Sequence, residues 1–403
     1  MQPIKIKEIP IFINKEDLSR MGDLKVYKIG ENITCPLGYD AATVFEAVQR
    51  GESKAKLHAT TFGLPEPFFG SVLDRQELHE RFSQIPQNGI RYTTFEQLSI
   101  LSAYDALQNA GLEGNRPDLF FVLSSTKGNI DLLENPDGFE KKRVEMGVSA
   151  QLIGRYFNNP NPVIVVSNAC TSGVVAQIHA KNILERNEKY KYAVVVGADL
   201  LSKFVVSGFQ SFKALSQERC KPFDANRCGL NLGEGAATVI LQRSKESITG
   251  KLQIAGCGNR NDANHISGPS RTGEGLYNSI QVALSESDAN LQEISFINAH
   301  GTATLYNDDM ESWAISRSGL EATPVNSLKA IFGHTLGAAG LIECIISGNA
   351  LQNGIILPSI GFESDGTVKK ITINPKLQHK NGKYFLKIIS GFGGSNAAIL
   401  FAQ

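Results

Sequence analysis

One cysteine and two histidines in this sequence stand in settings that suit nucleophilic chemistry. Cys170 follows the apolar run "VVSNA" and precedes "TSGVV", so its thiol lies between a predicted buried strand and a predicted helix. At a helix start, unpaired N–H groups and the positive end of the helix dipole favour an anion, so we expect the pKa of this thiol to be lowered. The same cysteine could instead be a small hydrophobic residue of the core.

Each of the two histidines lies beside glycine and next to an apolar stretch. His300 ends "ISFINAH" and is followed by "GTAT", while His334 lies within "KAIFGHTLGAAG". A histidine in such a position can present its imidazole to a cleft, although each could also be a hydrogen-bonded structural residue. A thiol with two imidazoles suits acyl transfer, in which the thiolate takes an acyl group and N–H donors stabilise an oxyanion or enolate.

Metal and phosphate sites have little support in the sequence. There is no HExxH motif and no His/Cys cluster with the spacing of a metal site, so we expect no bound metal. The stretch "SGFGGSNAAILFAQ" places three glycines around Phe392 but lacks the GxGxxG spacing and leads into a predicted strand. We expect a tight turn whose exposed backbone N–H groups could serve an oxyanion hole.

The elements that must position these residues follow an α/β pattern. Longer helical patterns alternate with short apolar runs, among them "DLFFVLSS", "NPVIVVSN", "YAVVVGAD", "AATVILQ", "ISFINAH" and "LKIISGFGG". Residues 94–111 keep apolar residues at helical spacing and close on a glycine, which predicts a helix with a glycine C-cap. A seam near "QRSKESITGKLQIAG" predicts two halves, residues 1–248 with Cys170 and residues 249–403 with both histidines.

Composition excludes several classes of protein. With 42% hydrophobic and 20% charged residues, the 403-residue chain can bury a large core. Its 40 basic residues balance 40 acidic ones, which argues against a nucleic-acid or membrane-surface protein. No stretch approaches the roughly 20 apolar residues of a membrane span, and residues 1–18 lack a signal-peptide core. Six scattered cysteines without a CxxC pair predict reduced thiols, so we expect a cytoplasmic protein.

Five motifs, in order, resemble those of the β-ketoacyl-acyl carrier protein synthases, condensing enzymes of the thiolase-like superfamily. The motifs are "NACTSG", "KPFDANRCGLNLGEGA", "NAHGTAT", "NSLKAIFGHTLGAAG" and "GFGGSNAA", and the similarity begins near residue 32 and runs to the end. The resemblance implies an α/β thiolase-like fold. In it, two similar halves stack as α-β-α-β-α layers with two five-stranded mixed sheets.

The resemblance also implies roles for individual residues. Cys170 matches the nucleophile that accepts an acyl chain from the phosphopantetheine of a carrier protein. His300 and His334 match the pair that assists malonyl decarboxylation and donates hydrogen bonds to the enolate. Lys329 and Glu311 fall at the positions of a supporting ion pair.

Further positions match the substrate path of the family. The backbone amides of Cys170 and Phe392 would form the oxyanion hole, and Phe392 would also be a gate between the acyl and malonyl sides. Thr302 and Thr304 match residues that bind the pantetheine arm. The implied enzyme is a stand-alone, type II acyltransferase, a 3-oxoacyl-[acyl-carrier-protein] synthase. Its reaction is a decarboxylative Claisen condensation without metal or organic cofactor, in fatty-acid, polyketide or polyene biosynthesis.

The implied partners are an acyl carrier protein and a second subunit, in a homodimer or in a heterodimer with a chain-length-factor homologue. The sequence departs from the family at Leu305, Asn307, Ser390 and Asn168, and at residues 59–89, so chain length and pathway cannot be carried over.

Three alternative functions fit the sequence less well. A non-catalytic chain-length factor would usually lack the cysteine. Against a CoA-using thiolase or a hydroxymethylglutaryl-CoA synthase relative, thiolases carry a second cysteine near the C-terminal glycine turn, and "SGFGGSN" has none. A papain-type hydrolase would leave one histidine idle.

Overall fold

The computed structural model describes residues 24–264 and 268–403, and its core is built on two five-stranded mixed groups of strands. The first group, in spatial order, is β1 (Lys25–Thr34), β8 (Gly235–Ser244), β6 (Tyr192–Asp199), β4 (Leu119–Ser124) and β5 (Ile164–Val166). The second is β9 (Leu252–Asn261), β15 (Ser395–Ala402), β14 (Tyr384–Gly391), β10 (Ile294–Asn298) and β11 (Val325–Asn326). Two residue pairs between β1 and β9 join the groups into one ten-stranded sheet.

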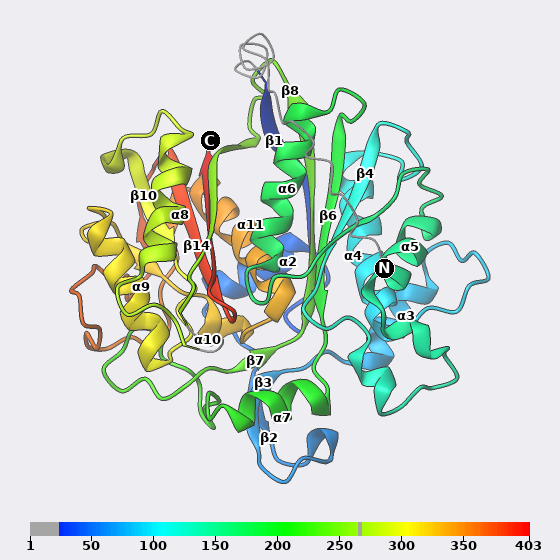
Figure 1. Ribbon diagram of the computed structural model, residues 1–403, viewed down its shortest axis with the longest axis horizontal. Coiled ribbons are helices and arrows are strands. Elements are labelled where there is room, and N and C mark those ends of the chain that lie inside the picture. The colour runs from blue at the N-terminus through cyan, green and yellow to red at the C-terminus, as the bar shows by residue number, and fades with distance from the viewer. Residues whose placement is uncertain (1–23, 265–267) are drawn as a thin grey trace, which may run out of the picture.

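Helices form three layers around these strands (Figure 1). The middle layer is α6 (Ser172–Arg186) and α11 (Ala339–Gln352), which contact each other and both groups of strands. The outer layers are α4 (Thr94–Ala110) with α5 (Met146–Tyr156), and α8 (Glu274–Ser285) with α9 (Leu305–Arg317). The remaining elements are α2 (Ala41–Gln49), α3 (Arg75–Ser83), α7 (Lys203–Ser211), α10 (Lys329–Phe332), β2 (Lys56–His58), β3 (Phe68–Ser71), β7 (Leu232–Gly233), β12 (Ile355–Ile356) and β13 (Gln378–His379).

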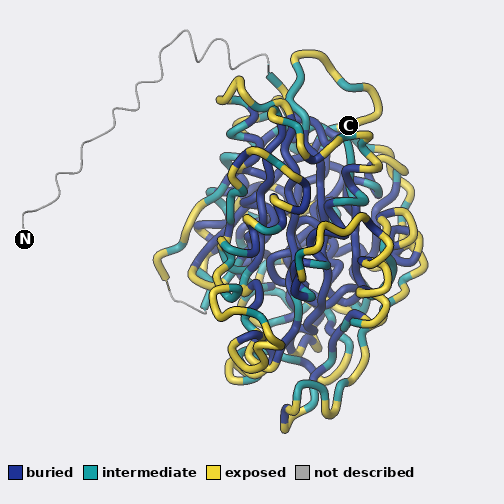
Figure 2. Tube along the Cα trace, turned by 90° about the vertical axis from the view of Figure 1, so that its right-hand side faces the viewer, coloured by how far each residue is buried: buried dark blue, intermediate teal, exposed yellow. Residues whose placement is uncertain are grey.

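Most residues of the middle layer are buried, and Figure 2 shows buried residues filling the interior of the molecule. Glycines let the backbones at the starts of α6 and α11 contact each other directly. A Cβ placed on Gly173 would lie 2.9 Å from the carbonyl oxygen of Gly337, and one on Gly340 would lie 2.7 Å from the backbone nitrogen of Val174. Because no larger residue fits there, these helix starts bring the Cys170 and His334 segments together.

The structure confirms the sequence predictions of fold and elements. Every predicted strand is present, and α4 begins at a Thr93–Glu96 capping box and ends at Gly111, whose φ is 63°. Residues 59–89, which diverge from the family, hold β3 and α3. The expectation about residues 1–18 falls outside the described residues, and the boundary between residues 248 and 249 stays a prediction. Among the described residues, no helix combines the length and apolar character needed to cross a membrane.

Candidate active site

Cys170 lies at the turn between β5 and α6, as the sequence predicts. The helix begins at Ser172 with Thr171 as its N-cap residue, so the cysteine directly precedes the first turn. Ala169 has a φ of 48°, in the left-handed region, which marks a sharp turn before the nucleophile. Gly391 packs against this turn, since a Cβ there would lie 3.0 Å from the backbone nitrogen of Cys170. The C-terminal glycine turn therefore reaches the cysteine.

The two predicted histidines converge on this cysteine from the other half of the chain. Nε2 of His334 lies 2.9 Å from Sγ of Cys170. The rings of His300 and His334 are close to perpendicular, at 80°, with centroids 5.0 Å apart. The sulfur and one nitrogen of each ring all lie within 4.8 Å of one another. All three residues are buried.

Hydrogen bonding assigns the tautomer of His334. Its Nδ1 accepts from the backbone N–H of Leu336 at 3.3 Å, so the proton of the neutral ring is on Nε2. Nε2 then donates to the sulfur of Cys170, which makes His334 a hydrogen-bond donor rather than a base toward the thiol. Burial, followed by the charges of Lys329 and Lys387, holds the pKa of this imidazole well below its usual value.

His300 is also held neutral. Burial is the largest cause of its strongly lowered pKa, and Lys329, His334 and Lys387 contribute in that order. Its Nδ1 is buried and has no hydrogen-bond partner among the described residues. Two neutral imidazoles beside one sulfur can donate N–H groups to a developing anion without carrying charge themselves.

The pKa of the Cys170 thiol differs from the sequence expectation. Burial raises it from 9.0 to about 11, while Lys329, the backbone N–H of Phe392 and Lys127 lower it. The helix start was expected to lower this pKa, and that expectation is wrong for the structure, because desolvation of the thiolate outweighs the nearby positive groups.

The predicted oxyanion-hole donors are the backbone N–H groups of Cys170 and Phe392. Phe392 lies in the turn between β14 and β15, where Gly393 and Gly394 have φ values of 83° and 79°. Its N–H is close enough to the thiol to lower the pKa of that group. Within the described residues, neither this N–H nor that of Cys170 donates to a backbone carbonyl in the turns and loops.

The predicted ion pair between Lys329 and Glu311 is wrong. The Lys329 ammonium pairs with Glu343 on α11, and both groups are buried. The Glu311 carboxylate instead accepts from the backbone N–H groups of His300 and Gly301, each at 2.7 Å. Because the Glu311 carboxylate accepts these backbone hydrogen bonds, it orders the His300 segment. It does not form the ion pair with Lys329. Burial, with the charge of Asp308, raises its pKa to about 7.

Sequence reasoning missed two buried charges beside the imidazoles. Glu343 also pairs with Lys387 on β14, at 2.6 Å, so one carboxylate serves two ammonium groups. Glu343 interrupts the apolar run "GLIECII", and Lys387 interrupts the apolar run "YFLKIIS". A single charged residue inside an apolar run was the sequence signal for both buried charges.

Cys170, His300 and His334 line a cavity of about 470 Å³. Thr302 and Thr304 line it, with their hydroxyl oxygens 2.8 Å apart, and their role in binding pantetheine stays a prediction. Phe392 also lines it, is 37% exposed, and has its ring centroid 5.9 Å from that of Phe209 and 5.4 Å from that of Phe212. Three of the residues that depart from the family line the same cavity: Leu305, Asn307 and Ser390.

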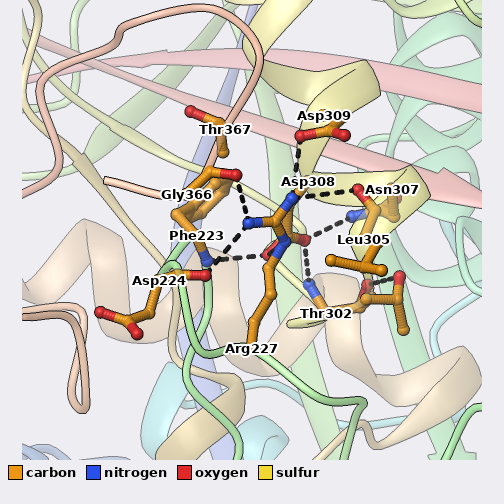
Figure 3. Close-up of polar contacts among 12 residues, drawn as sticks. Phe223, Asp224, Arg227, Thr302, Leu305, Asn307, Asp308, Asp309, Gly366 and Thr367 are labelled. Atoms are coloured by element: carbon orange, nitrogen blue, oxygen red, sulfur yellow. Dashed lines mark hydrogen bonds and ion pairs between the residues drawn. The ribbon is translucent and has the colours of Figure 1, made fainter. Parts of the chain in front are cut away.

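A buried polar cluster supports the threonine wall of the cavity (Figure 3). The Asp308 carboxylate accepts from the backbone N–H of Thr302 at 3.0 Å and from that of Phe223 at 2.8 Å. The Arg227 guanidinium pairs with Asp309 at 2.8 Å and donates to the carbonyl of Gly366. These contacts fix the segment between β10 and α9 that carries Thr302.

Two protein-family models match the chain. The β-ketoacyl synthase N-terminal domain matches residues 29–247, and the β-ketoacyl synthase C-terminal domain matches residues 252–363. The chain belongs to the β-ketoacyl synthase family. The predicted family and its enzyme class, acyltransferase, are thereby confirmed.

Relatives of this synthase include a 3-oxoacyl-[acyl-carrier-protein] synthase and a subunit of a polyketide synthase. It is 26% identical to 3-oxoacyl-[acyl-carrier-protein] synthase 2 of Vibrio cholerae, over 95% of this chain and 100% of the relative. It is 25% identical to the tetracenomycin polyketide synthase ketoacyl synthase alpha subunit of Streptomyces glaucescens, over 96% and 99%.

Solved structures show the same fold. A β-ketoacyl synthase from Burkholderia phymatum superimposes with a TM-score of 0.81 at 22% identity, over 94% of this chain and 99% of the other. A ketosynthase from Xenorhabdus doucetiae, solved with its chain length factor, gives a TM-score of 0.81 at 22% identity, over 94% and 98%.

Proposed function

We propose that this synthase condenses an acyl group held on Cys170 with a malonyl group carried by an acyl carrier protein. The observation that supports this most directly is the convergence of one sulfur and two neutral imidazoles within 4.8 Å of one another. This set also argues against a non-catalytic chain-length-factor role, in which the thiol would have no task.

The first step is transfer of the acyl group to Cys170. The sulfur attacks the thioester carbonyl of the acyl-carrier, and the N–H groups of Cys170 and Phe392 hold the oxyanion. As the tetrahedral intermediate collapses, the bond to the pantetheine sulfur breaks. The thiol proton of Cys170 ends on that departing sulfur, so the step needs no external base.

The second step forms the carbon–carbon bond. The malonyl carboxylate leaves as carbon dioxide, and the electron pair of the broken bond forms an enolate, whose oxygen His334 and His300 hold by N–H donation. The enolate carbon attacks the acyl carbonyl, the bond to the Cys170 sulfur breaks, and the released thiolate takes up one proton from the solvent, which the overall reaction consumes. The products are a β-ketoacyl-carrier, carbon dioxide and free enzyme.

We propose that neither step uses a metal or an organic cofactor, since loss of carbon dioxide itself generates the carbanion. A thiol and two imidazoles this close also make a set of possible zinc ligands, so zinc should bind and inhibit. A chelator should accordingly leave turnover unchanged, while added zinc should lower it. Loss of activity on chelation that zinc restores would overturn the proposal.

The proposed partners are the carrier protein and a second copy of the chain, with a chain-length-factor homologue as the alternative second subunit. Lys213 lies on the cavity wall, where a positive charge would favour the phosphate of a carrier arm. Strand β5 ends the sheet order, and its Ile164 and Val165 are only partly buried, so an antiparallel β5 of another subunit could extend the sheet. The free cysteines suit a reducing, cytoplasmic location.

Intact-protein mass spectrometry tests the proposal. Wild-type protein given a panel of acyl-carriers should gain one acyl group, and malonyl-carrier should then release carbon dioxide and a product two carbons longer. Cys170→Ala should gain no acyl group. Condensation by Cys170→Ala at the wild-type rate would overturn the assignment.

A further inference from the structure

We propose that Lys387 is a positioning residue for the condensation: its buried ammonium holds the peptide that carries His300 and adds a positive charge beside both imidazoles. The proposal rests on the proposed function, because that charge would act on the enolate formed there. It assigns a role to a lysine that none of the five family motifs contains.

The position of Lys387 is unusual for a lysine. It lies in the middle of β14, whose neighbouring side chains are apolar and buried, and it is itself fully buried. Its Nζ donates to the carbonyl oxygen of Ala299 at 3.1 Å and approaches that of Asn298 at 3.5 Å. In the parallel pairing of β10 with β14, Lys387 is the partner of Asn298, so it lies beside the end of the strand that leads to His300.

Contacts from two sides therefore fix the His300 segment. Lys387 binds the carbonyl that precedes His300, and Glu311 accepts from the N–H groups of His300 and Gly301. Because the peptides on both sides of the histidine are anchored to buried charges, the imidazole has little freedom to leave the sulfur.

Two ammonium groups share one carboxylate in this cluster. Lys329 and Lys387 both pair with Glu343, whereas Glu311 forms no ion pair with either lysine among the described residues. The charged and titratable groups around the imidazoles and the thiol are Cys170 ahead of α6, Lys329 on α10, Lys387 on β14, Glu343 on α11, Glu311 with Asp308 on α9, Asp199 at the end of β6, and Lys127. Both ammonium groups lower the pKa of the two imidazoles, and Lys387 offsets part of the rise in the pKa of Glu311. Their positive charge also favours an anion at the place where the enolate oxygen would lie.

Stability does not account for this arrangement. A buried ammonium loses its hydration, and a well-packed apolar residue in its place is often neutral or stabilising. Without Lys387, Lys329 and Glu343 would still form a one-to-one buried pair. Packing alone therefore does not require a lysine at this position, and we connect Lys387 with the chemistry instead.

The test compares Lys387→Met with Lys181→Met, a matched control. Lys181 is also a largely buried ammonium, paired with Glu185 farther along α6 and away from the imidazoles. We expect Lys387→Met to keep or raise the free energy of unfolding in urea and to raise the imidazole pKa values of His300 and His334, measured by NMR with labelled histidine. Carbon dioxide release from malonyl-carrier should fall by about tenfold, less than for loss of a direct oxyanion donor, while acylation of Cys170 stays unchanged.

The control should leave both imidazole pKa values and carbon dioxide release at wild-type levels. Lys387→Gln, which keeps an N–H donor for Ala299 but removes the charge, should repeat the pKa change of Lys387→Met. Unchanged imidazole pKa values in a folded variant, unchanged carbon dioxide release, or failure of both variants to fold would each overturn the proposal. If wild-type protein itself releases no carbon dioxide, the proposed function fails, and the imidazole pKa values still decide whether Lys387 sets the charge at the site.

Discussion

At the scale of single residues, the site is a buried thiol served by neutral donors rather than a resting thiolate–imidazolium pair. His334 donates to the Cys170 sulfur through Nε2, because its Nδ1 accepts from Leu336. A protonated imidazole would be poorly solvated here and would lie beside two ammonium groups. The reactivity of the cysteine must therefore develop as the thioester enters and its oxygen reaches the amides.

The first prediction concerns alkylation of Cys170 by iodoacetamide, which reports the thiolate. Because burial raises the pKa of the thiol to about 11, the rate constant should keep rising with pH through 9 and 10. Lys329→Met should lower that rate constant at each pH, because the Lys329 ammonium lowers the pKa of the thiol. Lys127→Met, the matched control, should have a smaller effect, because the Lys127 ammonium lowers the pKa of the Cys170 thiol less than the Lys329 ammonium does. A plateau reached near neutral pH would contradict this account.

At the scale of elements, catalytic geometry depends on the close packing of α6 against the segment that leads into α11. The Cys170 turn and the His334 segment meet where Gly173 faces Gly337, without room for a side chain. Interiors pack densely, so one added methyl group must displace backbone rather than a flexible side chain.

The second prediction follows from this packing. Gly173→Ala should lower the free energy of unfolding by about 1–3 kcal/mol, because its Cβ would lie 2.9 Å from a carbonyl oxygen. It should also slow acylation by shifting Cys170 relative to His334. Gly147→Ala in α5, where a Cβ meets nothing within 4 Å, should be neutral or slightly stabilising. Urea unfolding and the acylation rate check both; equal effects of the two variants would count against the packing argument.

The elements show what the sequence can and cannot predict. Apolar runs predicted the strands, helical spacing and Gly111 predicted α4, and the motifs located Cys170, His300 and His334. The partner of Lys329 was not predictable, because the choice between Glu311 and Glu343 depends on how α9 and α11 pack. The thiol pKa was mispredicted for a related reason: local helix geometry is visible in sequence, whereas burial is a property of the assembled layers.

At the scale of the whole molecule, the two halves supply different parts of one site. The first half contributes the cysteine from its helix start, and the second contributes both imidazoles and the buried ammonium groups. The middle helix layer holds these parts together, while β5 remains at the edge of the sheet.

The third prediction tests association through that edge. Ile164→Lys on β5 should turn the proposed dimer into a monomer in analytical ultracentrifugation, because the lysine would be buried against side chains of the partner strand on one face of the joined sheet. Val368→Lys, at a residue that is 62% exposed and outside β5, should leave the dimer intact. Dissociation by both variants, or by neither, would count against the β5 interface.

The most direct measurement of the central claim separates acyl transfer from decarboxylation in the histidine variants. Enzyme pre-loaded with an acyl group is mixed with malonyl-carrier labelled at the free carboxyl carbon, and released carbon dioxide is counted in a single turnover. We predict that His300→Ala and His334→Ala accept the acyl group but release little labelled carbon dioxide. Wild-type carbon dioxide release by both variants, or loss of acylation with decarboxylation intact, would contradict the account.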